Sequence, residues 1–102
     1  MVIRIGRYDF KGPFETSESL LAAPGVYVIL DQRSATCIVL DVGESYDVKT
    51  RVEKHERRGC WKKNSRGTWE VAVLYTPNME EAGRLAIERE LRDLCDPPCG
   101  KR

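Results

Sequence analysis

The strongest constraint on the fold is a pair of short apolar runs near the middle of the chain. Gly25–Leu30 reads GVYVIL and Thr36–Val42 reads TCIVLDV, and both are rich in β-branched and aromatic residues. Such runs favour β-strands, and the polar connection Asp31–Ala35 is short enough for a hairpin. Because neither run alternates regularly with polar residues, we expect both faces of this hairpin to be buried under helices.

The remaining predicted elements alternate between helix and strand. In chain order they are a helix from its N-cap Ser45 to about Arg58, closed by Gly59; a strand Trp69–Tyr75; and a helix opened by an Asn78–Glu81 capping box and running to about Leu94, with Gly83, Ile87, Leu91 and Leu94 as its apolar stripe. The predicted fold is α+β, with a small three-stranded mixed or antiparallel sheet flanked by helices. One domain spans residues 1–102, with 24–100 as the core and 1–23 as a less regular N-terminal extension, predicted as a strand or loop plus a short helical turn.

Composition indicates an ordinary globular chain. The 102 residues are 41% hydrophobic and 32% charged, and no apolar stretch approaches the roughly 20 residues of a membrane-spanning helix. Without a signal-peptide pattern we expect a cytoplasmic protein with no membrane partner, whose four cysteines are reduced, buried thiols. A zinc site that joins Cys95 and Cys99 to Cys60 and His55 is the alternative.

Positive charge is concentrated in one segment, although the whole chain has a formal net charge of only +1. Lys49–Arg66 holds eight basic residues against two acidic ones, a net charge of +6. A phosphate-contacting surface and a solvated helix face both account for this pattern. In the first interpretation, the backbone of a nucleic acid contacts Lys49, Lys54, Arg58, Lys62, Lys63 and Arg66. Trp61 and Trp69 flank the segment, where they either stack on unpaired bases or pack in the core.

A set of polar and glycine residues occurs in a recognisable order along the predicted elements. Gly25-Val26-Tyr27 lies on the first strand, Asp41-Val42-Gly43 ends the second, Arg51 and His55 lie four residues apart on the next helix, and Glu88 lies on the last helix. This set resembles the GIY-YIG nuclease superfamily over roughly residues 24–100. Gly25 and Gly43 match the glycines of the two family motifs, positions where glycine allows close approach of the backbone.

The resemblance implies a divalent-metal-dependent endonuclease that hydrolyses phosphodiester bonds in nucleic acid, with DNA as the expected substrate. It implies Mg²⁺ or Mn²⁺ as cofactor and Glu88 as the metal ligand, since Mg²⁺ commonly takes only one or two carboxylates. It places Arg51 on a phosphate oxygen, and Tyr27, Asp41 and His55 around the water and the leaving group. These five residues are therefore expected to converge on one concave face, and specificity is expected to come from a partner protein or another domain.

Two departures from the family pattern bear on turnover more than on fold. Asp41 stands where the family has the tyrosine that opens its second motif, and the segment around Gly100 lacks the asparagine that many members carry. A buried carboxylate needs a partner, so Asp41 is expected either to serve the metal or the water, or to form a structural ion pair with Arg51. A catalytically inactive module that binds nucleic acid or a protein is therefore the alternative function.

The metal-ligand prediction also has competing interpretations. Glu90 lies on the same predicted helix and competes with Glu88 as the ligand. Glu88 itself could instead form an exposed ion pair with an arginine four residues away, Arg84 or Arg92, which would contribute little to stability. Only the placement of these side chains can separate the alternatives.

Overall fold

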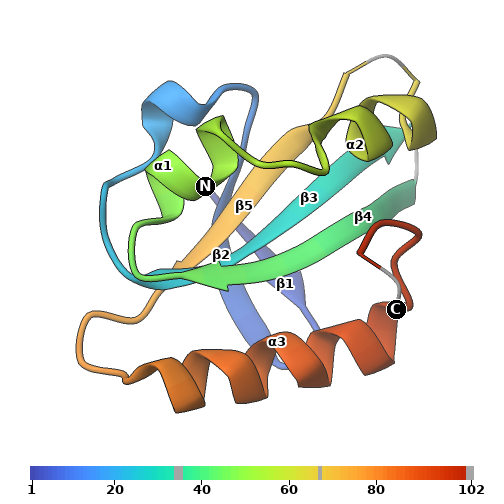
Figure 1. Cartoon of the computed structure of the whole chain (residues 1–102). Coiled ribbons are helices and arrows are strands. Elements are labelled where there is room, and N and C mark those ends of the chain that lie inside the picture. Colours follow the sequence, from blue (N-terminus) through green and yellow to red (C-terminus); the bar gives the residue numbers. More distant parts are fainter. Residues whose placement is uncertain (34–35, 67, 101–102) are drawn as a thin grey trace.

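The sheet is built from strands that are all antiparallel to their neighbours (Figure 1). The computed structural model describes residues 1–33, 36–66 and 68–100. Across the sheet, the strands in these residues lie in the order β1 (Val2–Ile5), β2 (Tyr8–Phe14), β5 (Glu70–Tyr75), β3 (Gly25–Arg33) and β4 (Thr36–Ser45). The helices in the described residues are α1 (Val48–Glu53), α2 (Arg58–Asn64) and α3 (Glu81–Cys95), with a 3-10 turn at Ser17–Ser19. The α+β class is confirmed, but the part of the sheet that the structure describes has five strands where three were predicted.

The hairpin predicted from the two apolar runs is present as β3 and β4. Tyr27 pairs directly with Gly43 across the hairpin, and β3 also pairs with β5 on its other side. Successive residues of β3 point to opposite faces, as a strand requires. Tyr27 and Ile29 pack in the cluster on one face, and Val26, Val28 and Leu30 pack in the cluster on the other. Burial on both faces is therefore confirmed, while residues 34–35 of the predicted connection lie outside the described residues.

The N-terminal segment, predicted as a strand or loop plus a short helical turn, forms β1 and β2 and then the 3-10 turn at Ser17–Ser19. These strands form a hairpin, and β2 then pairs with β5, which extends the sheet on the side away from β4. Phe10 of β2 is fully buried in the cluster under α3. The strand is hard to recognise in the sequence because Gly12 and Pro13 disfavour strands, and the register with β5 shifts between Lys11 and Phe14.

The single helix predicted from Ser45 to Arg58 is wrong, because the chain forms two short helices there. Asp47 is the N-cap of α1, and its side chain accepts a hydrogen bond from the Thr50 backbone N–H. The helix ends at Glu53, and α2 begins only at Arg58, so Gly59 lies inside α2 and does not close a helix. The break turns His55 into the interior, where hydrogen bonds to its ring replace helical ones.

The last helix is confirmed, with changes at its start and on its buried face. α3 begins at Glu81, and its N-cap residue Glu80 makes no side-chain hydrogen bond, so the predicted Asn78–Glu81 capping box is absent. Ile87 and Leu91 are buried as predicted, but Leu94 is 62% exposed. Its predicted burial is wrong because Leu94 lies beside Gly6, in the turn between β1 and β2, and glycine has no side chain to cover it.

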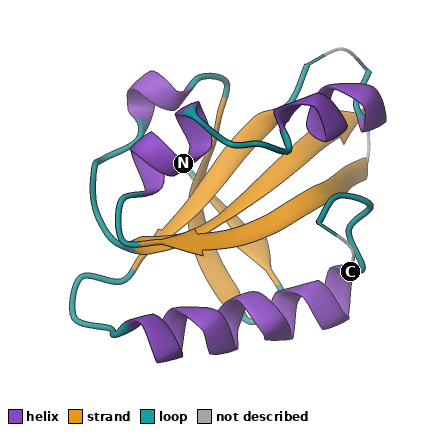
Figure 2. Ribbon diagram, viewed as in Figure 1, coloured by secondary structure: helices purple, strands orange, loops and turns teal. Residues whose placement is uncertain are grey.

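Helices cover the two faces of the sheet, with α1 and α2 on one face and α3 along the other (Figure 2). The first layer packs on a cluster that contains Trp61 and Tyr27, and the second on a cluster that contains Phe10 and Leu91. Among the described residues, no helix has the length and apolar character needed to cross a membrane. Because β4 lies at the sheet edge, long side chains from the two layers can meet beside it.

Candidate functional site

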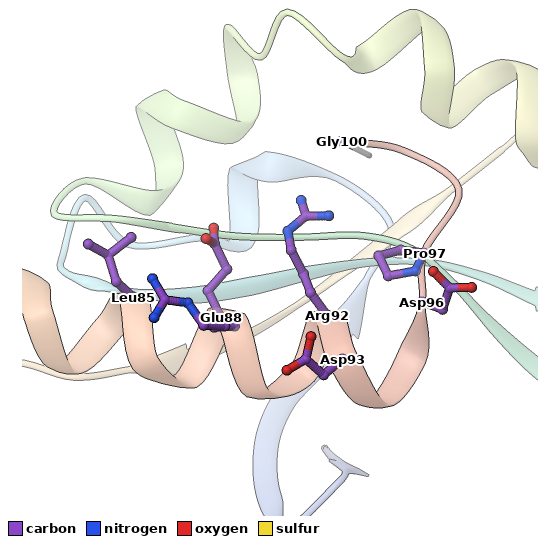
Figure 3. Close-up of a pocket in the computed structure, with 8 residues that line it drawn as sticks. Leu85, Glu88, Arg92, Asp93, Asp96, Pro97 and Gly100 are labelled. Carbon is purple, nitrogen blue, oxygen red and sulfur yellow. The ribbon is translucent and has the colours of Figure 1, made fainter. Parts of the chain in front are cut away.

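A cavity of about 300 Å³ lies beside the edge strand β4. Side chains from both helix layers line it: Tyr27 from β3, Glu44 from β4, Arg51 from α1, Arg57 from the α1–α2 connection, Leu85, Glu88 and Arg92 from α3, and the backbone of Gly100. α1 and α3 pack on opposite faces of the sheet, but Glu88 and Arg92 of α3 also line the cavity. Their side chains point from the helix toward β4 (Figure 3). The structure therefore brings Tyr27, Arg51 and Glu88 together, whereas Asp41 and His55 lie buried outside the lining.

Tyr27 lines the cavity although it is a buried residue. Tyr27 as a whole is 1% exposed, and burial raises the pKa of its hydroxyl well above the usual value. The positive charge of Arg51 opposes this shift without cancelling it. Tyr27 is therefore protonated at neutral pH and serves as a hydrogen-bond donor, not as a ready base.

His55 reaches the cavity only through Tyr27. Its Nδ1 accepts a hydrogen bond from the Arg57 backbone N–H at 3.0 Å, so in the neutral ring the proton resides on Nε2. Nε2 lies 2.9 Å from the Tyr27 hydroxyl oxygen and donates to it. Burial, together with the nearby Arg51 and Arg57 guanidinium groups, lowers the pKa of His55 to about 4. At neutral pH the imidazole is uncharged, and it positions the phenol.

Arg51 forms a surface ion pair at the mouth of the cavity. Its Nη1 and Nη2 atoms donate to the two carboxylate oxygens of Glu56 at 2.6 and 3.0 Å. The Glu56 side chain is 62% exposed, and ion pairs of this kind contribute only about 0–1 kcal/mol. An anionic ligand can therefore replace Glu56 on Arg51 at small cost.

Glu88 is the unpaired carboxylate of the cavity. It is half-buried, and among the described residues its carboxylate has no ion pair or hydrogen bond, so the predicted alternative of an ion pair with Arg84 or Arg92 is absent. Burial raises the pKa of Glu88 above its ordinary value, and the charge of Arg92 opposes the shift. A carboxylate kept partly desolvated without a partner is typical of a functional site.

The other carboxylates near Glu88 are already engaged. Glu44 also lines the cavity, but Arg84 of α3 donates to it from Nε at 2.8 Å. Glu90, the competing metal ligand in the sequence, accepts hydrogen bonds from Arg7 at 2.9 Å and from Tyr8 at 2.8 Å. It is therefore engaged at the β1–β2 hairpin and does not line the cavity.

Asp41 is the centre of a buried hydrogen-bond cluster. Its carboxylate is fully buried and accepts from Arg57 Nε at 2.8 Å, from Trp61 Nε1 at 2.8 Å and from the backbone N–H of Val42 at 2.8 Å. Arg92 Nη2 donates to Oδ1 from the other side. The expected structural ion pair thus exists, although its partners are Arg57 and Arg92 and not Arg51.

A disulfide joins Cys60 of α2 to Cys99 in the C-terminal segment, so the expectation of four reduced thiols is wrong for this pair. Cys37 and Cys95 are free. Within the described residues no three histidine, cysteine, aspartate or glutamate side chains gather as a metal-binding group, and nothing supports the alternative of a structural zinc site with His55.

The C-terminal segment closes one side of the cavity. Cys99 donates from its backbone N–H to the Leu40 carbonyl of β4 at 3.0 Å, and its own carbonyl accepts from Arg92 Nη1 at 3.1 Å. Gly100 follows with a φ of 81° and lines the cavity. A second hollow of about 400 Å³ adjoins this one and shares its Leu85, Glu88, Arg92 and Gly100 lining (Figure 3). The two form one groove along α3.

The basic segment lies on the layer formed by α1 and α2. Its phosphate-contact candidates are exposed, apart from the half-buried Lys49: Lys54, Arg58, Lys62, Lys63 and Arg66. Trp61 is fully buried, so it cannot stack on a base. Trp69 is partly buried, with Arg58 over its ring at 5.2 Å. These positions leave both interpretations of the segment, phosphate contacts or a solvated face, in place.

Sequence reasoning missed Arg57 and Arg92 as site residues. Arg57 belongs to the basic segment, but nothing in the local pattern separates it from its neighbours. Arg92 was considered only as a partner of Glu88. The one available signal was Asp41, because a buried carboxylate requires compensating donors, and arginine supplies them best.

Comparison with known proteins identified no relative of this chain. No protein-family model, no curated protein and no solved structure matches the chain.

Proposed function

We propose that this protein is a metal-dependent nuclease of the GIY-YIG type, with DNA as the first substrate to test. One observation carries the proposal: Tyr27, Arg51 and Glu88, which come from three separate elements, line a single cavity. Phosphodiester hydrolysis needs a hydrogen-bond donor, a cationic group for the phosphate and a carboxylate for a cation, all within reach of one phosphate.

The cavity suits a divalent cation that is shared with the substrate. Mg²⁺ commonly takes one or two carboxylates and completes its shell with water and substrate phosphate, so a single unpaired carboxylate is sufficient. Glu88 would hold the cation, because Glu44 is paired with Arg84 and Asp41 with two arginines. When bound, Mg²⁺ or Mn²⁺ supplies Lewis-acid stabilisation of the charge on the phosphate.

The remaining residues orient the substrate. Arg51 exchanges its surface partner Glu56 for a non-bridging phosphate oxygen, which its planar donor pair fits well. His55 donates to the Tyr27 oxygen, and this leaves the Tyr27 hydroxyl proton available to an oxygen in the cavity. Tyr27 thereby orients a water molecule or the leaving oxygen while it remains protonated. The exposed basic residues of α1 and α2 attract and position the strand.

Cleavage assays on plasmid, branched DNA and RNA with Mg²⁺ or Mn²⁺ test the proposal. Glu88→Gln is expected to abolish cleavage, and Arg51→Gln to lower its rate about 10²–10³-fold, as for the loss of one electrostatic contact to the reacting group. Glu81→Gln, two turns away on the same helix, serves as the matched control and is expected to cleave normally. Undiminished cleavage by Glu88→Gln would rule out the assigned role of that carboxylate.

A second function is favoured by the state of Asp41. At the position where the family carries a tyrosine, the side chain is fully buried and bonded to Arg57, Arg92 and Trp61. A group so engaged has no capacity to act on water, which favours a module that binds nucleic acid without cutting it. Salt-sensitive binding without metal-dependent cleavage would identify this alternative.

A further inference from the structure

We propose that Arg57 and Arg92 form a second phosphate-binding position in the cavity, distinct from Arg51 and held in place by Asp41. The inference rests on the proposed function in that the ligand belongs to a nucleic-acid strand. Its chemical class is one phosphate group, supplied either by a neighbouring phosphodiester or by a terminal phosphate monoester.

Both guanidinium groups are held by Asp41 on their buried side and are partly exposed on the side that lines the cavity. Asp41 is fully buried, whereas the side chains of Arg57 and Arg92 are 28% and 23% exposed and line the cavity. Arg57 donates to Asp41 through Nε at 2.8 Å, and Arg92 donates through Nη2. Because Asp41 already fixes both side chains, an incoming anion meets donors that lose little conformational freedom on binding.

Donors and charge remain for a ligand. Among the described residues Arg57 Nη1 makes no hydrogen bond, and its nearest acidic neighbour, Glu56 Oε1, lies 3.8 Å away at the surface. The three groups Asp41, Arg57 and Arg92 together carry a net charge of +1, and the Glu88 carboxylate lines the same cavity. A phosphate group both neutralises that charge and fits the planar donor geometry of arginine.

The backbone at Gly100 keeps the arginines accessible. A Cβ atom on Gly100 would lie 2.6 Å from Arg92 Nη2 and 3.1 Å from Arg57 Cζ, so any side chain would press on both groups. The φ of 81° also favours glycine at this position. Backbone alone therefore borders the two guanidinium groups on this side, and a ligand oxygen can approach them.

The cavity thus contains two cationic positions with separate anchors. Arg51 is held by the exposed Glu56, and the Arg57–Arg92 pair is held by the buried Asp41. Two anchored positions in one cavity suit two phosphate groups of the same strand. A ligand with a second phosphate should therefore bind more tightly than a ligand with one.

Trp61 offers a local readout. Its Nε1–H donates to the same Asp41 oxygen as Arg57 Nε, so its indole NMR resonance responds when the pair binds an anion. We would titrate the protein, in metal-free buffer with a chelator, with three probes: a thymidine dinucleotide with one phosphodiester, the same dinucleotide with a 5′-phosphate, and a trinucleotide with two phosphodiesters.

The expected result is a shift of the Trp61 resonance and roughly tenfold tighter binding of a probe with the second phosphate, the gain expected of one charge-assisted contact. If only the 5′-phosphorylated dinucleotide binds more tightly, the second phosphate is a terminal one. If the trinucleotide binds more tightly, the second phosphate is an internal phosphodiester. Arg57→Gln should remove the gain. Arg4→Gln removes the same charge from β1, at the opposite edge of the sheet from β4, and should keep the gain in affinity.

Equal affinity for all three probes, or a gain that survives in Arg57→Gln, would overturn the inference. If Arg57→Gln does not fold, Gly100→Ala tests the same point, since its methyl group crowds both arginines. The titration uses no metal and no cleavage. A protein that never cleaves can therefore still show the second position, and an active nuclease without the gain would contradict the inference alone.

Discussion

The phenol of Tyr27 lies over Gly43, its direct partner across the β3–β4 hairpin, and occupies the space where a side chain at position 43 would begin. The two motifs that suggested a nuclease are therefore linked by packing. Because a methyl group at Gly43 would overlap the Tyr27 hydroxyl, Gly43→Ala is expected to destabilise the fold by about 1–3 kcal/mol and to displace the phenol from His55. Urea unfolding measures the first effect, and the Nε2 resonance of His55 the second.

Gly59→Ala is the matched control for this change. Gly59 lies in α2, and nothing is within 4 Å of the Cβ that would be added. Alanine is the better helix former, so this variant is expected to be stabilised by up to about 1 kcal/mol. Equal losses in both variants would show that the Gly43 effect has no connection with Tyr27.

The second prediction concerns the pH dependence of stability. The folded protein lowers the pKa of His55 to about 4, whereas the unfolded chain has the ordinary value of about 6.5. Between these values the unfolded state binds the proton and the native state does not, so stability is fully present above about pH 6.5 and falls as the pH drops toward 4. The loss attributed to His55 is on the order of 3 kcal/mol.

Unfolding of His55→Gln across the same pH range isolates that contribution. Glutamine can still donate to Tyr27 but does not titrate, so the variant should lose stability less steeply between pH 6.5 and 4. Parallel curves for the two proteins would mean that other groups account for the pH dependence.

The third prediction separates function from stability at Glu88. Its pKa is raised in the folded state, so the native protein binds the proton more readily than the unfolded chain does. Its contribution is therefore most favourable below the unfolded pKa and is lost as the pH rises through the folded pKa. At neutral pH Glu88→Gln should raise the melting temperature while removing metal-dependent cleavage, as expected where a site is kept at a cost to stability. A lowered melting temperature would instead assign Glu88 a structural role.

The fourth prediction concerns the link between Cys60 and Cys99. The two cysteines are separated by 39 residues, and closing a loop of that length stabilises a fold by about 4 kcal/mol in the chain-entropy model. A thiol reductant should lower the unfolding free energy of the wild type by roughly this amount. The double variant Cys60→Ser/Cys99→Ser should be insensitive to reductant, and Cys37→Ser, which lacks only a free thiol, should respond like the wild type.

Local patterns predicted the parts of the fold whose signals are strong over short stretches. The apolar runs of β3 and β4 and the periodic Ile87 and Leu91 of α3 identify elements without knowledge of their neighbours. The N-terminal segment was predicted only as a strand or loop, because β2 includes Gly12 and Pro13 and becomes a strand only by pairing with β1 and β5. The predicted single helix failed at its centre because tertiary hydrogen bonds to one residue, His55, outweigh local helix propensity.

The sequence likewise predicted one part of the candidate site and missed another. Tyr27, Arg51 and Glu88 could be selected because the motif order marks them, and the structure places all three on one cavity. The roles of Arg57 and Arg92 could not be selected, since they depend on Asp41, which lies sixteen residues from one and fifty-one from the other. The sequence indicates that a buried carboxylate needs hydrogen-bond donors, but only the folded structure shows which side chains supply them.

The position of the cavity beside the edge strand β4 affects how the protein can self-associate. An edge strand presents unpaired backbone groups that can recruit a strand from another molecule. On β4 the Leu40 carbonyl accepts from Cys99, and the Val42 carbonyl accepts from Arg92. These contacts occupy two backbone carbonyls of the edge strand, so a strand added at this part of β4 would have to displace them.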